Sequence, residues 1–369
     1  MKAAVLYEND QPIKIETDID IIEPRAGEVR VNIAYCSLCH SDYSVISGAM
    51  GPIPGPIIVG HEAAGVVESV GEGVHHLAVG DHVILTPVPP CGSCYYCQRG
   101  DHSLCTNGHS IATNRLPDGT TGLSQKGNEI LRGVGVGALA EQVVAPASGA
   151  IKIPNDIPLN IACVVGCAMQ TGVGAVLNTA KVETGATVLV LGLGGIGLAT
   201  VQGAKLASAS KIIVSDPLAE RRELAMKLGA THTIDPTSED VQAQAMLLTD
   251  GIGVDYAFET AGLASLIELG VNASRAGGMT VCVGAPPIEQ GIKLDNVVIF
   301  TSMEKKLCGC LLGSCNSPYD IPRMMKFYQS EQLDLDSMVG RMRPLEEINE
   351  AFDDLHHGRE IRTVMKIGG

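Results

Sequence analysis

Apolar and polar positions follow two different patterns along the chain, and the pattern changes near residue 168. In the first part, apolar residues alternate with polar ones over short segments separated by glycine and proline. Segments of this kind stand at 28–36, 55–71, 79–88 and 139–146. A period of two bounded by turn residues is typical of β-strands. The first part is therefore predicted to form a barrel or sandwich-like domain of many short strands.

Beyond residue 168, buried strands alternate with helices. Helical spacing is present at 168–182, and the segment 184–207 predicts a strand, a glycine-rich turn and a helix in that order. The segment 218–230 predicts an amphipathic helix that ends at Gly229. The other strands of this part are predicted at 211–217, 253–262 and 277–286. Regular alternation of strand and helix predicts a doubly wound parallel sheet, so the expected fold class is α/β.

The composition fits a cytosolic globular protein of two domains. The chain has 369 residues, which is too long for one compact core, and 45% of them are hydrophobic. A net charge of −15 and the absence of Trp argue against nucleic acid and anionic membranes as partners. The opening MKAAVLYEND lacks the apolar region of a secretory signal, and the apolar runs are too short to span a bilayer. We therefore expect the twelve cysteines to be thiols or metal ligands.

Four cysteines lie close together in the segment CGSCYYCQRGDHSLC, residues 91–105. They are Cys91, Cys94, Cys97 and Cys105. This spacing lets four thiolates converge on one tetrahedral Zn²⁺, and four protein ligands leave no open position. The segment therefore predicts a structural zinc site. Four unrelated thiols and a nucleic-acid-binding zinc ribbon are the alternatives, and the acidic charge of the chain disfavours the ribbon.

The segment GLGGIG, residues 192–197, matches the dinucleotide-binding fingerprint between a predicted strand and a predicted helix. We expect Gly192 to make the tight turn, Gly194 to admit a pyrophosphate, and Gly197 to let helix and strand pack closely. The helix N-terminus offers free N–H groups to the phosphates. The turn is completed by two further expected cofactor contacts, Gly195 and Ile196.

Asp216 stands at the end of the next predicted strand, as the fingerprint requires. A carboxylate there suits a ribose 2′-OH and repels a 2′-phosphate, so the sequence favours NAD over NADP. The alternative is that Asp216 serves only as a turn or N-cap residue before Pro217. Arg221 and Arg222 lie nearby, either at the ribose or on a solvated helix face.

The segment CSLCHSD, residues 36–42, has a CxxC pattern followed by a histidine. From the residues alone it suits half of a zinc ribbon, a redox pair or part of a catalytic metal site. His61 and Cys167 are further candidates for metal ligands, although each also suits a packed core position. Spacing alone cannot assemble these residues, because they lie far apart in the sequence.

Taken together, these motifs resemble those of the zinc-dependent medium-chain alcohol dehydrogenases over nearly the whole chain. The matching stretches are CSLCHSD, VGHEAAGVVESVGEGV, CGSCYYCQRGDHSLC, GCAMQTGVGAVLNTAKVETG, GLGGIG with Asp216, and IRTVMKI. The chain is most similar to the long-loop branch that includes the class I and the glutathione-dependent class III enzymes. The resemblance implies a GroES-like β-barrel catalytic domain over 1–168, a Rossmann NAD-binding domain over 169–312, and a return to the catalytic domain over 313–369.

The resemblance also implies two Zn²⁺ per chain and a role for each site residue. The catalytic zinc would be held by Cys39, His61 and Cys167, a Cys₂His set with an open position that is the established example for alcohol dehydrogenases. Glu62 would approach this zinc from behind, and Asp42 would orient His61. Ser41 would hydrogen-bond the substrate oxygen. The expected cofactor contacts are Thr171 at the nicotinamide, His40 and Arg362 at the pyrophosphate, Arg221 near the adenosine ribose, and Val283.

Several positions depart from the pattern of the animal enzymes. Ser44 stands where those enzymes end their proton relay with a histidine, and a serine cannot hold the proton. His40 replaces an arginine at the pyrophosphate, so we expect weaker or pH-dependent NAD binding. His109 stands about where class III enzymes carry an arginine for the glutathione carboxylate, and Arg115 is the remaining candidate. A less aromatic pocket, open to bulky or branched alcohols, would be lined by Pro87 and Leu139.

The predicted reaction is the NAD-linked interconversion of alcohols with aldehydes or ketones, in which zinc polarises the substrate oxygen and hydride passes to the nicotinamide. Three alternatives stay open: a nicotinoprotein with permanently bound NAD, a dehydrogenase of glutathione–formaldehyde adducts, and a non-catalytic zinc or nucleotide-binding protein. In this family the long segment 114–133 goes with dimers, so the resemblance implies a homodimer with the Rossmann sheets joined edge to edge. We expect a small-molecule substrate and a cytoplasmic location.

Overall fold

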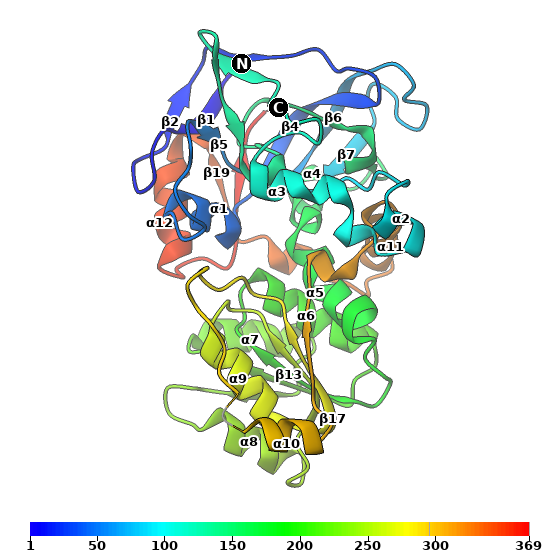
Figure 1. Cartoon of the computed structure of the whole chain (residues 1–369), viewed down its shortest axis with the longest axis vertical. Coiled ribbons are helices and arrows are strands. Elements are labelled where there is room, and N and C mark those ends of the chain that lie inside the picture. The colour runs from blue at the N-terminus through cyan, green and yellow to red at the C-terminus, as the bar shows by residue number, and fades with distance from the viewer. Residues whose placement is uncertain (295, 369) are drawn as a thin grey trace. The chain divides into compact units, whose positions relative to one another are not determined.

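The structure is a computed structural model, and it describes residues 1–294 and 296–368. The chain divides into two compact units: unit 1 is Met1–Ala168 with Asn316–Gly369, and unit 2 is Met169–Cys315. Gly369, the last residue of the predicted 313–369 segment, lies outside the described residues. Figure 1 shows both chain ends on unit 1.

The chain returns to unit 1 at Asn316 rather than at the predicted residue 313. The difference has a local cause, because Cys315 is fixed within unit 2. Its Sγ donates to the carbonyl of Gln170 at 3.3 Å and accepts from the Asn178 side chain at 3.4 Å.

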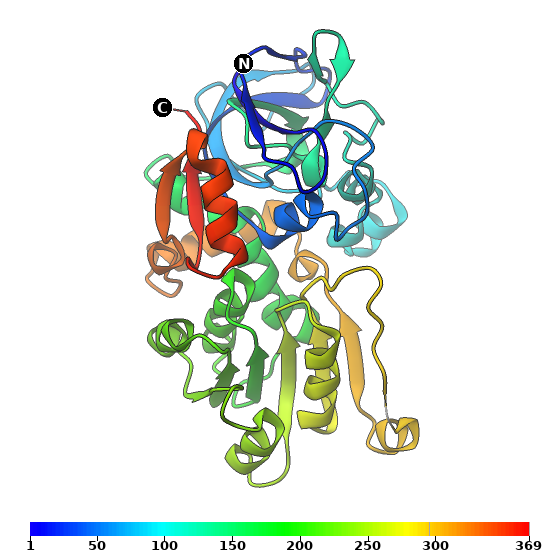
Figure 2. The same ribbon diagram turned by 90° about the vertical axis from the view of Figure 1, so that its left-hand side faces the viewer.

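Unit 1 is built mainly from antiparallel sheets, as its alternating pattern predicts. The large sheet has the order β12-β7-β6-β4-β20-β19, with β11 paired to β4. Its strands are β4 (Glu28–Ser37), β6 (Glu62–Val70), β7 (His82–Leu85), β11 (Gln142–Pro146), β12 (Ala150–Lys152), β19 (Arg341–Pro344) and β20 (Thr363–Lys366). The C-terminal β20 pairs with β4, and Figure 2 shows this red segment packed against the blue N-terminal part of unit 1.

Two smaller sheets complete unit 1, with the orders β10-β5-β1-β2 and β3-β8-β9. Their strands are β1 (Ala3–Leu6), β2 (Lys14–Glu16), β3 (Ile19–Ile21), β5 (Ile57–Ile58), β8 (Leu123–Gln125), β9 (Asn128–Glu129) and β10 (Leu131–Arg132). The predicted long loop 114–133 therefore contributes three of these strands. The helices of unit 1 are α1 (His40–Ile46), α2 (Tyr95–Arg99), α3 (Ser110–Thr113), α4 (Leu159–Ala162), α11 (Ser317–Gln329) and α12 (Ile348–His356).

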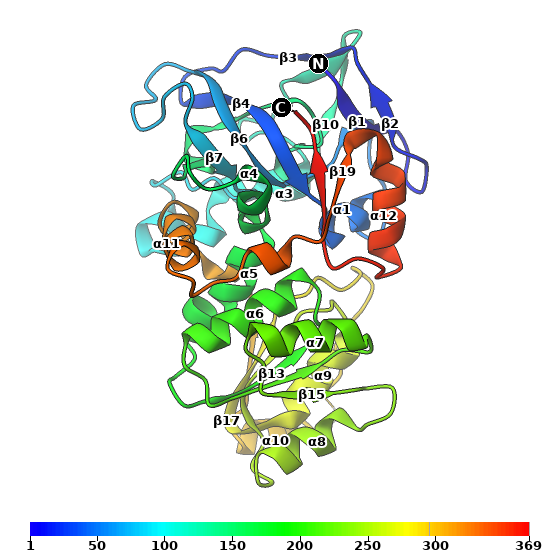
Figure 3. The ribbon, with the colours of Figure 1, turned by 180° about the vertical axis from the view of Figure 1, so that it is seen from behind.

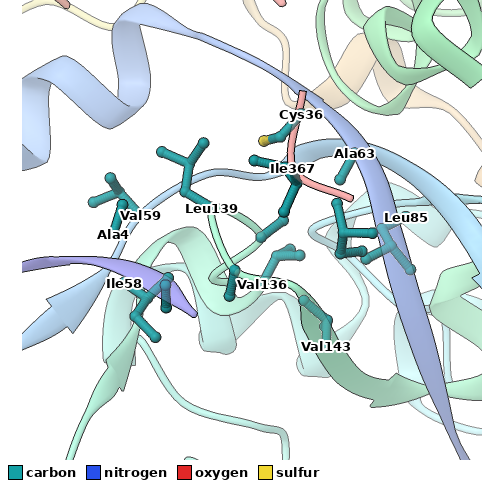
Figure 4. Close-up of a cluster of buried hydrophobic side chains, with 14 of the residues drawn as sticks. Ala4, Cys36, Ile58, Val59, Ala63, Leu85, Val136, Leu139, Val143 and Ile367 are labelled. Atoms are coloured by element: carbon teal, nitrogen blue, oxygen red, sulfur yellow. The ribbon is translucent and has the colours of Figure 1, made fainter. Parts of the chain in front are cut away.

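The core of unit 1 lies between these sheets (Figure 4). Cys36, near the end of β4, is buried in it among aliphatic side chains and is therefore a packing residue. Leu139 is also fully buried in this core. The prediction that Leu139 lines a substrate pocket is therefore wrong. Leu139 stands before β11, where its nitrogen donates to the Val59 carbonyl at 3.0 Å and its carbonyl accepts from the Ala4 nitrogen at 2.8 Å, so its side chain is removed from water in the core.

Unit 2 has the predicted doubly wound parallel sheet, in the order β15-β14-β13-β16-β17-β18. The strands are β13 (Thr187–Leu191), β14 (Lys211–Ser215), β15 (His232–Ile234), β16 (Val254–Glu259), β17 (Ser274–Cys282) and β18 (Lys306–Gly309). The strand order reverses at β13, and ligands of such sheets bind outside the carboxyl ends of the strands at that point.

Helices cover both faces of the sheet in unit 2. Figure 1 shows α9 (Ala264–Ala273) in front of the strands, and Figure 3, from behind, shows α6 (Gly195–Leu206) and α7 (Ala219–Leu228) in front of them. The predicted helix at 218–230 thus forms and ends at Gly229. The other helices are α5 (Ala168–Gly174), the π-helix η6 (Ala175–Ala180), α8 (Val241–Leu248) and α10 (Val297–Ser302).

None of the helices in the described part of the chain meets, by itself, the length and hydropathy needed to cross a membrane. One bent pair, Leu159–Gly166 with Ala168–Ala180, meets both requirements only when its two helices are taken together. Most of these residues are buried in the protein.

Candidate metal and cofactor sites

Four buried side chains of unit 1 converge on one point. They are Cys39, His61, Glu62 and Cys167, and one ligand atom from each lies within 4.8 Å of all the others. Cys39 directly precedes α1, and His61 directly precedes β6. Cys167 follows the short 3₁₀ helix η5 (Cys163–Gly166). Residues from three distant segments are thus brought together by the fold, which no spacing rule predicts.

His61 is held in place by its backbone and by Asp42. Gly60 has φ of +98°, and a side chain there would place its Cβ 2.8 Å from Leu139, so only glycine fits before the histidine. Asp42 Oδ1 lies 3.0 Å from His61 Nδ1 and accepts from the Gly60 backbone nitrogen at 2.8 Å. This contact directs the other ring nitrogen, Nε2, into the cluster.

The residues of this cluster fit a zinc ion. Nε2 of His61 is buried without a hydrogen-bond partner among the described residues. Such an atom is costly unless a ligand satisfies it. A hydrogen bond from Cys167 and the charge of His61 hold the pKa of Cys39 well below its usual range, which favours the thiolate that zinc requires. Two sulfurs and an imidazole are a common donor set for catalytic zinc.

Glu62 forms a buried ion pair with Arg362 beside the cluster. Arg362 Nη1 pairs with Glu62 Oε2 and also donates to Ser37 Oγ at 3.0 Å. The amide of Ala168 donates to Glu62 Oε1 at 3.2 Å. Burial raises the pKa of Glu62 to about 8, although the charge of Arg362 lowers it. The sequence did not predict this ion pair, which occupies one nitrogen of Arg362. The role of Arg362 at a pyrophosphate stays a prediction.

Helix α1 begins immediately after Cys39 and carries the next predicted site residues. The Ser41 hydroxyl lies 3.8 Å from Cys39 Sγ and is half-buried. His40 is exposed at the first turn. Ser44 donates its hydroxyl to the His40 carbonyl at 3.0 Å, so it is engaged in the helix backbone. Ser41 is therefore a hydroxyl of this helix that contacts the cluster.

The four cysteines of 91–105 form a second cluster, with their sulfurs within 4.8 Å of one another. Backbone amides point at these sulfurs: Cys91 N lies 3.2 Å from Cys105 Sγ, and Cys94 N lies 3.3 Å from Cys91 Sγ. The amide of Ser93 lowers the pKa of Cys91. The amide of Cys97 lowers the pKa of Cys94 to about 5. Burial instead raises the pKa of Cys105 to about 12. Four thiols in this arrangement fit a closed structural zinc site.

The glycine-rich turn of unit 2 connects β13 to α6. Gly192 has φ of +93°, and its nitrogen donates to the Ser215 carbonyl at 2.9 Å. A Cβ on Gly197 would lie 2.0 Å from the Gly192 carbonyl oxygen, so the turn and the helix touch. Gly194, the N-cap of α6, faces open space. Free helical N–H groups beside an uncovered glycine suit a phosphate. The remaining turn residues are half-buried: Gly195 and Ile196.

Asp216 lies beside this turn at the end of β14. Its carboxylate accepts from the Leu193 nitrogen at 2.8 Å and from the Leu218 nitrogen at 2.9 Å. Arg221 Nη1 stands 3.8 Å from Asp216 Oδ2, and the Nε of Arg221 is buried without a partner among the described residues. Asp216 thus stabilises the turn, which agrees with the alternative that it is a turn residue. It also stands where the fingerprint places a ribose contact.

Thr171 and Val283 are the other predicted cofactor contacts in unit 2, and both are buried. The hydroxyl of Thr171 has no hydrogen-bond partner in the described part of the chain. Val283 follows β17, and its nitrogen donates to the Glu259 carbonyl at 2.9 Å. Glu259, at the end of β16, was missed by the sequence analysis. A carboxylate that closes a buried apolar strand is the signal that marks it.

Two protein-family models match this chain. "Alcohol dehydrogenase GroES-like domain" matches residues 25–155, and "Zinc-binding dehydrogenase" matches residues 195–330. An alcohol dehydrogenase zinc-binding domain protein from Burkholderia ambifaria is 33% identical, with 100% of this chain and 99% of that chain covered and a TM-score of 0.94. The benzyl alcohol dehydrogenase of Acinetobacter calcoaceticus is 30% identical, with the same coverage and a TM-score of 0.93.

A third similar structure carries a nucleotide. It is described as a zinc-binding dehydrogenase from Sinorhizobium meliloti 1021 bound to NADP, and it is 26% identical, with 99% of this chain and 98% of that chain covered and a TM-score of 0.81. The chain belongs to the zinc-dependent medium-chain alcohol dehydrogenase family, a class of oxidoreductases with a GroES-like domain and a Rossmann-like domain.

Proposed function

We propose that this protein is a zinc-dependent, NAD-linked alcohol dehydrogenase that interconverts primary or secondary alcohols with aldehydes or ketones. The observation that carries the proposal is the buried cluster of Cys39, His61 and Cys167, in which His61 Nε2 lacks a partner among the described residues. These three residues would hold the catalytic zinc, and Cys91, Cys94, Cys97 and Cys105 would hold a structural one. The donor sets support one open and one closed zinc site.

When bound, zinc supplies a Lewis acid for the substrate oxygen, and the nicotinamide nucleotide supplies or accepts a hydride. The chain's own residues supply orientation and a path for the proton. Asp42 fixes the ring of His61 through the 3.0 Å contact. The half-buried Ser41 hydroxyl, 3.8 Å from Cys39 Sγ, would relay the proton, accepting it from the alcohol while releasing its own toward solvent. Ser44 has no role in this proposed transfer, because its hydroxyl donates to the His40 carbonyl.

NAD is the proposed cofactor because of Asp216. The carboxylate is buried at the end of β14, beside the glycine-rich turn. A 2′-phosphate there would meet a negative charge, whereas a ribose 2′-OH would find an acceptor. The nearby Arg221 is 3.8 Å from this carboxylate, which offsets part of its own positive charge. The NADP-bound relative makes the choice between the two nucleotides the first point to test.

The glutathione alternative has less support. Arg115 donates to both carboxylate oxygens of Glu129, at 2.7 and 2.6 Å, and to the Gly119 carbonyl at 3.1 Å. A guanidinium held in this bidentate pair is already engaged, and it does not offer the free fork that a glutathione carboxylate needs. Activity that depends on added glutathione would restore this alternative.

The proposed assembly is a cytoplasmic homodimer with the sheets of unit 2 joined at their edges. Its support is that β18 is an edge strand and is preceded directly by the exposed apolar residues of α10. An exposed edge strand can pair with a second copy of itself.

The decisive experiment is a panel of aliphatic, aromatic and branched alcohols assayed with NAD and with NADP by initial rate. The expected result is zinc-dependent turnover with NAD and a preference over NADP. A protein that binds one zinc per chain and turns over none of these alcohols would contradict the proposal. Nucleotide that stays bound through extensive dialysis would indicate a nicotinoprotein instead.

A further inference from the structure

Glu259 is a fully buried carboxylate at the carboxyl end of β16. Its Oε1 accepts from three successive backbone nitrogens, those of Ala261, Gly262 and Leu263, at 2.8, 2.7 and 3.2 Å. Its main-chain carbonyl accepts from the nitrogens of Val283 and Gly284, both at 2.9 Å. One residue therefore holds two loops, the loop after β16 and the loop after β17.

The two loops are also packed directly on each other. A Cβ on Gly284 would lie 2.2 Å from the Gly262 nitrogen and 2.8 Å from Glu259 Oε2. The next residue, Thr260, donates its hydroxyl to the Gly192 carbonyl at 2.7 Å, so the same strand end also supports the glycine-rich turn. A shift in one loop must therefore be followed by the other.

The strand order places these loops where the second nucleotide of a dinucleotide, the one that does not carry the adenine, would bind. In the proposed function, the pyrophosphate lies at the turn after β13 and the adenosine ribose lies at Asp216 after β14. Because β14 and β16 flank β13 on opposite sides, the second nucleotide extends over the ends of β16 and β17. Those ends carry the loops that Glu259 holds.

Helix capping alone accounts for only part of this arrangement. Leu263 is the N-cap of α9, so Oε1 satisfies nitrogens that precede a helix. A surface aspartate does the same for α8, where Asp240 Oδ1 accepts from Ala243 at 2.9 Å. Burying a carboxylate is far more costly than exposing one, and Glu259 Oε2 has no partner among the described residues. The additional cost of burying the Glu259 carboxylate is explained by a second role, which is to fix the position of both loops.

We infer that Glu259 is a positioning residue for the nicotinamide half of the cofactor, acting through the loops 261–263 and 283–284. The inference rests on the proposed function. It predicts that a change at Glu259 weakens ligands that contain nicotinamide and spares ligands that end at the ribose.

The test compares NADH with ADP-ribose, which lacks the nicotinamide. The chain has no Trp, so binding can be followed by NADH fluorescence, and ADP-ribose can be measured by displacement or calorimetry. Glu259→Asp shortens the side chain and withdraws Oε1 from its three donors. We expect its Kd for NADH to rise about tenfold and its Kd for ADP-ribose to stay within about twofold. Glu259→Gln keeps an acceptor at full reach and should hold the NADH Kd within about threefold of the unsubstituted enzyme.

Two further variants separate positioning from stability. Asp240→Ala removes a helix cap and should lower the melting temperature without changing the ratio of the two Kd values. Gly284→Ala shifts the same loops with Glu259 intact, so it should reproduce the selective loss of NADH, and it decides the matter if Glu259→Asp does not fold. Equal losses for both ligands, no loss for either, or failure of Glu259→Gln to retain NADH would overturn the inference. An unsubstituted enzyme that binds neither ligand would contradict the proposed function instead.

Discussion

Asp42 Oδ1 lies 3.0 Å from His61 Nδ1, and both side chains are fully buried. The contact fixes which ring nitrogen faces the cluster. Asp42→Asn is expected to raise the Kd for the zinc that Cys39, His61 and Cys167 would hold about 10–100-fold, because a partner that orients a ligand tunes metal affinity by that factor. Competition with a chromogenic chelator measures it. Asp156→Asn, on the surface, is the control, and equal affinities in the two variants would contradict a role for Asp42.

The CxxC pattern at 36–39 separates into two different roles. Cys39 joins the buried cluster, whereas Cys36 packs in the apolar core (Figure 4). Cys39→Ser should abolish turnover and lose one zinc per chain. Cys36→Ser should keep both metals and lose only about 1–3 kcal/mol of stability, the cost of an added buried hydroxyl. Metal analysis and initial rates check both variants, and equal damage from the two would restore a paired role for these cysteines.

The second cluster should act on stability rather than on turnover. Cys97→Ser is expected to release one zinc and to lower the melting temperature by roughly 5–10 °C, since the free energy of metal binding contributes to folding. The zinc that remains should still support activity in the folded fraction. Cys308→Ser in unit 2 is the matched control, and it should keep both metals. A Cys97→Ser enzyme with two zinc ions per chain would show that these thiols are not ligands.

The architecture was predictable from sequence because it rests on local regularities. Alternation with a period of two marked β4, and the strand–turn–helix pattern around Gly192 marked β13 and α6. The ion pair of Glu62 with Arg362 was not predictable, because it joins residues 300 positions apart through the pairing of β20 with β4. For Leu139 the prediction of a pocket position was wrong. An apolar residue suits the wall of a pocket and the core equally well, so its sequence position did not distinguish the two.

Asp216 gives the sharpest test of nucleotide choice. Asp216→Asn keeps an acceptor for the Leu193 nitrogen but removes the charge that opposes a 2′-phosphate. We expect the ratio of kcat/KM for NAD to that for NADP to fall at least about tenfold, mainly through a lower KM for NADP. Asp235→Asn is the control, because Asp235 pairs with Arg222 at 3.0 Å after the neighbouring strand β15. An unchanged ratio in Asp216→Asn would leave Asp216 as a turn residue only.

The proposed dimer can be tested at the edge of the sheet in unit 2. In the described part of the chain, β18 pairs only with β17, so its outer backbone groups offer a template for another strand. Val298, on α10 directly before β18, is 76% exposed, and its neighbours Val297 and Ile299 are exposed as well, so three consecutive apolar side chains face solvent there. Val298→Glu is expected to shift light scattering from dimer toward monomer, because a charge buried between two copies must be desolvated.

The matched control is Leu247→Glu on α8, where the apolar side chain is 72% exposed but lies far along the chain from the edge strand. Because exposure and the added charge are alike in the two variants, a difference in molar mass between them must come from position. If both variants remain dimers, α10 does not lie in the interface. A tetrameric unsubstituted protein would contradict the proposed assembly itself, since a single pair of joined sheet edges closes at two copies.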